Sequence, residues 1–185
     1  MVAFITENFD LPILDWIAKH VTSPILDRLM PAITVLGNGG ILWLILAALL
    51  LLSKKHRATG ITLAAALLMG LILCNLTMKP LFDRMRPFAY QLQHFGNTIP
   101  LLIPAPTDPS FPSGHTIASF EGATVLWLYK KKWGIPAAIT ALAIAFSRLY
   151  LYVHFPTDVL CSVFLGIGIG LLTHFLVSKY HSASQ

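Results

Sequence analysis

Charged residues are scarce in this sequence. Asp, Glu, Lys and Arg make up 11% of the 185 residues and 56% are hydrophobic, whereas an ordinary soluble domain has charge on about a quarter of its residues. Cysteine is also scarce: Cys74 and Cys161 both lie in apolar segments, which predicts two buried hydrophobic side chains rather than a disulfide or a metal site. The composition therefore indicates an integral membrane protein and excludes an ordinary soluble domain.

The sequence favours neither a nucleic-acid-binding protein nor a cleaved secretory signal. The formal net charge is +5, but with so few charges in total this sum does not predict a nucleic-acid partner. The N-terminal stretch contains Glu7, Asp10 and Asp15 where a secretory signal would have basic residues, so no cleaved signal peptide is expected.

Apolar runs predict a single all-α domain over residues 1–185, a bundle of transmembrane helices. A membrane-spanning helix needs about 20 apolar residues. Five segments have this character: the uncharged stretch that ends in "ILWLILAALLLL", and residues 60–78, 113–129, 133–153 and 156–177.

The segment before these spans has a different pattern. Residues 7–36 alternate apolar pairs with charged residues and contain three prolines, which predicts interfacial amphipathic helices rather than a span. A sixth, short span near residues 24–36 stays open, although Asp27 and Arg28 would be costly at membrane depth without partners.

The basic residues predict how the spans are oriented. Lys and Arg favour short cytoplasmic loops, and the clusters at 54–57 and 130–132, together with Lys179, fall on one face if five spans alternate. The opposite, extracytoplasmic face then receives the segment "LGNGG" and a Pro-rich loop over residues 79–112. A connection of this length often carries function.

Polar residues cluster at three places on this outer face. In "KPLFDRMRP", Lys79 and Arg86 are seven residues apart and would share one face if this segment is helical, with a break favoured just after Arg86 by Pro87. In "PSGHT", Ser113 can cap the helix that follows. The backbone N–H groups of Gly114 and His115 can then point outward, as in helix starts that bind anions.

The third cluster is "SRLYLYVHFPTD", residues 147–158. Arg148 closes one span, and His154 and Asp158 open the next across a bend in which Pro156 suits the first helical turn. Because Asp158 follows His154 by four residues, a near-helical bend would bring its carboxylate to the imidazole ring. That contact would hold the tautomer whose other nitrogen is a nucleophile.

Together the clusters predict a phosphate site. Preorganised cations and N–H donors stabilise the charge on phosphoryl oxygens, and a guanidinium group can bind two of those oxygens at once. A two-metal site is poorly supplied, because beyond the N-terminal segment the outer face offers only Asp83 and Asp108 besides Asp158.

The three clusters resemble the signature motifs of the type 2 phosphatidic acid phosphatases. K-x(6)-R-P occurs at 79–87, P-S-G-H at 112–115 and S-R-x(5)-H-x(3)-D at 147–158. Three motifs in order are far more specific than any one alone, and the resemblance covers roughly residues 30–178. This family often has six spans, and a first helix ahead of the amphipathic segment is expected to be missing here.

The resemblance also implies a mechanism without metal or other cofactor. His154 looks like the nucleophile that forms a phosphohistidine, with Asp158 orienting it, and His115 looks like the general acid and later the base that activates water. The other matched residues look like a phosphate cradle: Lys79, Arg86, Ser113, Gly114 and Arg148.

A lipid phosphatase at the outer face of the cell membrane is therefore the expected function. Candidate substrates are undecaprenyl pyrophosphate, phosphatidylglycerol phosphate and phosphatidic acid, and the compact chain resembles bacterial forms that recycle the polyprenyl carrier. Two alternatives stay open: a transporter or flippase that binds a phosphorylated lipid without cleaving it, and a phosphotransferase that passes the phosphoryl group to an acceptor other than water. The oligomeric state is not predicted.

Two features lie outside the matched positions. Arg84 and Asp83 are expected to form a solvated local pair. Glu121 lies in the middle of an apolar span, where an acid usually marks function. Alternatively, Glu121 is protonated or paired with a Ser, Thr or Asn of a neighbouring helix.

Overall fold

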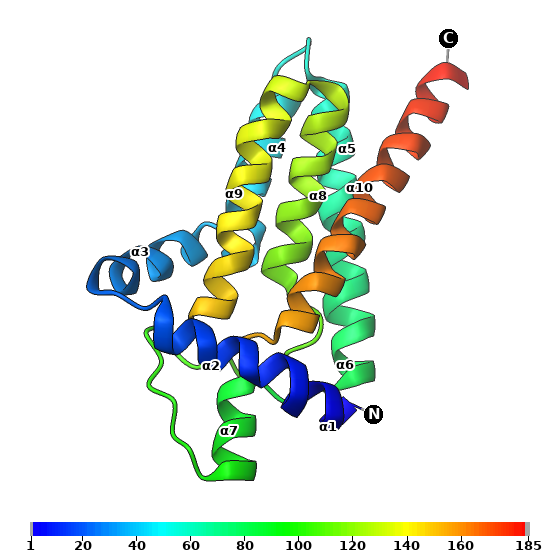
Figure 1. The fold of residues 1–185 in the computed structure, drawn as a ribbon. Coiled ribbons are helices and arrows are strands. Elements are labelled where there is room, and N and C mark those ends of the chain that lie inside the picture. The colour runs from blue at the N-terminus through cyan, green and yellow to red at the C-terminus, as the bar shows by residue number, and fades with distance from the viewer. Residues whose placement is uncertain (1, 184–185) are drawn as a thin grey trace.

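The chain folds into a bundle of helices. The computed structural model describes residues 2–183, and no strand occurs within this range. Figure 1 shows long helices packed side by side, with α1 and α2 lying across one end of the bundle and α3 projecting beside it. The predicted all-α class is confirmed.

The central helix of the bundle is α8, which packs against α5, α9 and α10. Its buried Ile117 and Val125 join a core that includes Trp43, Leu63 and Ala141. The bundle helices are α4 (Ile41–Leu52), α5 (Arg57–Leu71), α8 (Gly114–Tyr129), α9 (Lys131–Tyr150) and α10 (Pro156–Ala183).

Several of these helices are candidate membrane spans. Three helical segments are long and apolar enough to cross a membrane, within Arg57–Phe95, Lys131–Tyr150 and Pro156–Tyr180. A fourth candidate is the pair α3 (Pro24–Val35) and α4, whose axes are bent by 45°. Because α8 has only 16 residues, about 24 Å, the count of five spans stays a prediction.

The N-terminal residues form one continuous helix. It contains α1 (Val2–Ile5), the π-helical segment η1 (Thr6–Asp10) and α2 (Leu11–His20). Leu14 is buried against the bundle, whereas Phe9 and Trp16 are exposed. This two-sided pattern agrees with the predicted amphipathic helices, although the helix begins earlier than residue 7.

The predicted loop over residues 79–112 contains helices. A second π-helical segment, η3 (Ile72–Met78), continues α5 into α6 (Lys79–Phe82). Asp83 ends α6 with a left-handed φ of 38°, and α7 begins at Pro87 and runs to Phe95. Lys79 and Arg86 therefore do not lie on one helix, so the condition for a shared helical face is not met.

The two ends of the bundle differ in charge and chemistry. The basic connections at 54–57 and 130–132 lie together, since the rings of His56 and Trp133 meet at 4.8 Å between centroids. The three motifs lie at the other end, near α2 and α7 (Figure 1). Of the two cysteines, Cys74 is buried as predicted, but Cys161 is exposed, so half of that prediction was wrong.

Candidate active site

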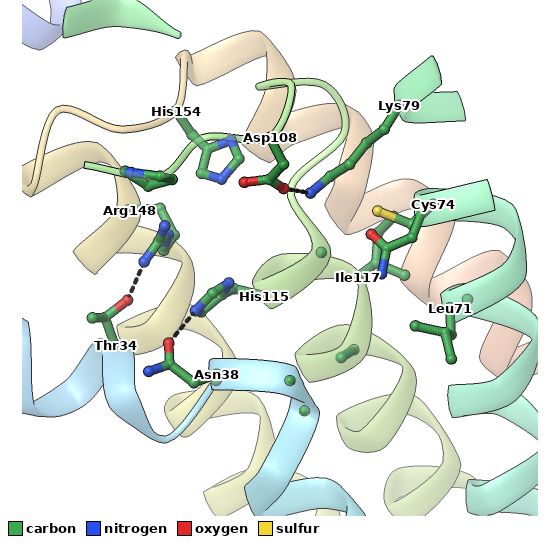
Figure 2. Close-up of a pocket in the computed structure, with 18 of the residues that line it drawn as sticks. Thr34, Asn38, Leu71, Cys74, Lys79, Asp108, His115, Ile117, Arg148 and His154 are labelled. Carbon is green, nitrogen blue, oxygen red and sulfur yellow. Dashed lines mark hydrogen bonds and ion pairs between the residues drawn. The ribbon is translucent and has the colours of Figure 1, made fainter. Parts of the chain in front are cut away.

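A cavity of about 1080 Å³ enters the motif end of the bundle. One part is polar, and the other runs between apolar residues of α4, α5 and α8 (Figure 2). The polar side chains that line it include Asn38, Lys79, Arg86, Asp108, His115, Glu121, Arg148 and His154. The apolar residues include Leu44, Ala64, Leu67, Leu71, Ile117 and Ala118.

Six of the eight predicted site residues line this cavity. They come from the beginning of α6, the residue before α7, the first turn of α8, the last turn of α9 and the turn after it. The six are Lys79, Arg86, Gly114, His115, Arg148 and His154. Ser113 and Asp158 lie behind them and are fully buried.

His154 lies in the turn between α9 and α10. Pro156 occupies the first position of α10 as predicted, and Asp158 Oδ2 accepts a hydrogen bond of 2.9 Å from the Phe155 N–H. This carboxylate lies 3.7 Å from His154 Nδ1, close enough for an ion pair but longer than a hydrogen bond. The bend therefore brings the two residues together in the way that their spacing predicts.

The opposite edge of the His154 ring faces Arg86. Nη1 of Arg86 lies 3.3 Å from Nε2 of His154 and donates to the Val153 carbonyl at 2.7 Å. Because a guanidinium group can only donate, this contact places a lone pair on Nε2 and the proton on Nδ1, toward Asp158. Nε2 is then the nucleophilic nitrogen.

Burial keeps His154 neutral. The side chain is 2% exposed, and this burial lowers the pKa of His154 to about 4. The charges of Arg86 and Arg148 add to the shift, and Asp158 opposes it. The neutral ring is the form that can attack phosphorus, so the nucleophile is available throughout the neutral pH range.

Asp108 joins two residues of the predicted phosphate cradle. Its carboxylate accepts a hydrogen bond of 2.8 Å from Arg86 Nη2 and forms an ion pair with Lys79. Partial burial would raise the pKa of Asp108, but the hydrogen bond from Lys79 and the charge of Arg86 outweigh it and lower the pKa to about 2. The two cations therefore converge on one anionic group, as they would on a phosphate.

Two further contacts come from the last turn of α3 and from the turn between α3 and α4. Thr34 Oγ1 accepts a hydrogen bond of 2.6 Å from Arg148 Nη1, and Asn38 Oδ1 lies 2.8 Å from His115 Nε2 (Figure 2). Sequence reasoning placed "LGNGG" on the same face but assigned it no role. The run of glycines is the sequence feature that could have indicated a role. The structure needs glycine at these positions, because a Cβ at Gly37 would lie 2.7 Å from the His115 ring and Gly39 has a φ of 56°.

Ser113 departs from its predicted role. It is the N-cap residue of α8, yet its side chain makes no capping bond and instead accepts from Thr116 Oγ1 at 3.0 Å. Its backbone N–H donates to Ser162 Oγ at 2.8 Å. The capping prediction was wrong, and of the "PSGH" motif only Gly114 and His115 face the cavity.

Arg84 is not in a solvated pair with Asp83. Its guanidinium group binds the buried carboxylates of Asp10 and Asp158, whereas Asp83 is exposed. The left-handed φ of Asp83 turns the chain, so that Arg84 points into the protein rather than toward its neighbour. Sequence reasoning missed both Arg84 and Asp10 as partners of the site.

Glu121 is fully buried between α8 and α5. Within the described residues neither carboxyl oxygen has a hydrogen-bond partner, so pairing with a Ser, Thr or Asn is not what the structure shows. A Cβ at Gly70 of α5 would overlap this carboxyl group. The missing side chain of Gly70 therefore makes the space that Glu121 fills.

We expect Glu121→Gln to leave turnover within about twofold of wild type, because the residue lies six positions beyond His115, about 9 Å along the helix. Glutamine has nearly the same shape and needs no charge in the apolar part of the cavity. Phosphate release and thermal unfolding of the purified variant would test this. A large loss of activity with unchanged unfolding would contradict a purely structural role.

A metal site of protein ligands is not apparent in the part of the chain that the structure describes. No group of three or more His, Cys, Asp or Glu side chains in residues 2–183 is arranged to hold a metal ion. The cationic side chains that line the cavity are Lys79, Arg86 and Arg148.

The sequence matches known proteins over most of its length. Residues 58–182 match the PAP2 superfamily. The chain is 38% identical over 132 residues to an undecaprenyl-diphosphatase of Sulfolobus acidocaldarius, a match that covers 71% of this chain and 61% of that protein. It is 31% identical over 175 residues to phosphatidylglycerophosphatase B of Bacillus subtilis, with 88% and 79% covered.

The fold also matches a solved structure. The crystal structure of LpxE from Aquifex aeolicus superposes with a TM-score of 0.74 at 28% sequence identity, and the match covers 89% of this chain and 93% of that one.

Proposed function

Because the chain belongs to the PAP2 superfamily, we propose that it is a membrane phosphatase that hydrolyses a phosphomonoester or pyrophosphate of a lipid. One observation carries this proposal. A single cavity holds His115, His154 and three cationic side chains at one end and continues between apolar residues of α4, α5 and α8. These two parts fit a phosphate group and the beginning of a hydrocarbon chain.

In the first step, Nε2 of His154 attacks phosphorus and the bond from phosphorus to the leaving oxygen breaks. His115 gives a proton to that oxygen, so the lipid product leaves as an alcohol or a monophosphate and a phosphohistidine remains. Arg86 and Arg148 stabilise the charge that develops on the phosphoryl oxygens.

In the second step, His115 takes a proton from water as the water oxygen attacks phosphorus. The phosphorus–nitrogen bond then breaks, inorganic phosphate leaves and His154 is restored. Each histidine thus returns to its starting state, and this scheme needs no metal ion or other cofactor.

We favour a polyprenyl diphosphate as the substrate and the extracytoplasmic face as the location of the site. The first point is supported by the relative from Sulfolobus acidocaldarius, which is an undecaprenyl-diphosphatase. The second is supported by the basic residues at 54–57 and 130–132, which lie at the end of the bundle away from the cavity. Phosphatidylglycerol phosphate and phosphatidic acid are the competing substrates.

Purified protein in detergent with excess EDTA should release inorganic phosphate from undecaprenyl pyrophosphate faster than from phosphatidylglycerol phosphate or phosphatidic acid. Release should persist in EDTA because the cationic side chains stabilise the phosphoryl charge without a metal. Phosphate release and the lipid product would be measured together. Binding of these lipids with no release would favour the transporter, and a phosphorylated acceptor in place of inorganic phosphate would favour the phosphotransferase.

A further inference from the structure

Arg84 links two buried carboxylates from distant parts of the chain. Its Nη1 donates to Asp158 Oδ1 at 2.5 Å, and its Nη2 donates to Asp10 Oδ2 at 2.7 Å. The side chains of both aspartates are 0% exposed, and that of Arg84 is 15% exposed. One guanidinium group therefore bridges two carboxylates that have little access to water.

The N-terminal helix takes part in this network through its π-helical segment. Thr6 Oγ1 accepts from Arg84 Nη2 at 3.0 Å. Asp10 also accepts from the backbone N–H and the hydroxyl of Thr157, at 2.9 and 2.8 Å. Residues 6–10 thus bind both Arg84 and the first turn of α10, and π-helical segments are often found at functional sites.

The same network determines where the Asp158 carboxylate lies. Arg84 holds Oδ1, while Oδ2 accepts from Ser110 Oγ at 2.5 Å and from the Phe155 N–H at 2.9 Å. These bonds leave Oδ2 facing His154 Nδ1 at 3.7 Å. Arg84 also lies over the ring of Phe155, 4.0 Å from its centroid, so it contacts the residue directly after the nucleophile as well.

We propose that Arg84 is a positioning residue for His154, acting through Asp158, and that Asp10 of the N-terminal helix holds Arg84 in place. This inference rests on the proposed function, because it assigns a role in the reaction of His154. It extends the site beyond the matched region, 58–182, to a segment at the beginning of the chain.

The experiment is a double-mutant cycle with Arg84→Gln and Asp158→Asn, in which kcat and KM for phosphate release are measured in detergent. Arg84→Gln should lower kcat by about 10- to 100-fold and change KM by less than about twofold. In the Asp158→Asn background the same substitution should change kcat by less than about threefold, because residues that act as a unit are not additive. Asp10→Asn should lower kcat by about 3- to 10-fold.

Two matched controls make the same kind of carboxylate-to-amide substitution at residues outside the network. Asp83→Asn changes the exposed residue next to Arg84, and Glu7→Gln changes a residue of the same N-terminal helix that accepts from Tyr90. Both should retain wild-type kcat. If Arg84→Gln does not fold, Asp10→Asn in the Asp158→Asn background tests the same coupling.

The outcomes separate this inference from the proposed function. Wild-type protein that releases no phosphate from any lipid would overturn the proposed function. Active wild-type protein in which Arg84→Gln and Asp10→Asn have normal kcat would overturn only the positioning role. The same holds if the effect of Arg84→Gln persists at full size in the Asp158→Asn background, since a structural residue would behave in that way.

Discussion

Replacing His154 with alanine is expected to lower kcat for phosphate release by at least about 10⁴-fold, the effect of removing a nucleophile from an enzyme that forms a covalent intermediate. His154 is the residue whose ring has a buried carboxylate at Nδ1 and a cation at Nε2. The remaining cations can still bind phosphate, so inhibition by inorganic phosphate should persist in the variant.

Phosphoprotein formation would show which step is lost. With a radiolabelled lipid pyrophosphate, whose phosphate leaving group departs without the proton that His115 gives, His115→Ala should retain label on the protein, because this variant lacks the base that activates water. His154→Ala and the double variant should retain none. His94→Ala is the matched control, since His94 is exposed and stacks on Tyr90 at 4.1 Å between ring centroids. Release by His154→Ala within tenfold of wild type would rule out the phosphohistidine route.

The sequence was sufficient to predict that three distant motifs lie together. Each motif lies at the end of an apolar segment, and alternating spans bring those ends to one face. The bend at Pro156 and the approach of Asp158 to His154 also follow from local rules, because an i, i+4 spacing and a proline at the first helical position depend on nearby residues only.

The partners of the site residues could not be predicted in the same way. Ser113 donates its N–H to Ser162, 49 residues away, and this contact depends on how closely α8 packs on α10. Asn38 reaches His115 across 77 positions, through a turn whose glycines have no periodic signal. Such contacts depend on the rotation and separation of packed helices, and hydrophobic periodicity determines neither.

Arg84 shows how a local expectation can fail. Opposite charges at adjacent positions favour a surface pair, but Asp83 has a left-handed backbone that directs the two side chains apart. A carboxylate buried without a partner is costly, and Arg84 satisfies two of them, Asp10 and Asp158. The stronger requirement, to give each buried carboxylate a charged partner, decides the arrangement.

Arg148→Lys is expected to lower kcat/KM by about 10²- to 10³-fold, although it keeps the positive charge. Arg148 is 3% exposed and donates to Thr34 Oγ1 from Nη1 at 2.6 Å. Its buried Nε has no hydrogen-bond partner within residues 2–183, and buried donors in native proteins are nearly always paired. A phosphate in the cavity would supply the acceptor.

The ammonium group of lysine is a point charge, whereas the guanidinium group of arginine is planar and has two parallel N–H donors. Lysine therefore cannot bind two phosphoryl oxygens in the same way. Arg57→Lys, at the start of α5 and at the other end of the bundle, is the matched control and should retain full activity. Both variants would be compared by kcat/KM and by thermal unfolding. A folded Arg148→Lys protein with nearly wild-type kcat/KM would show that charge alone suffices there, and would remove Arg148 from the groups that recognise phosphate by shape.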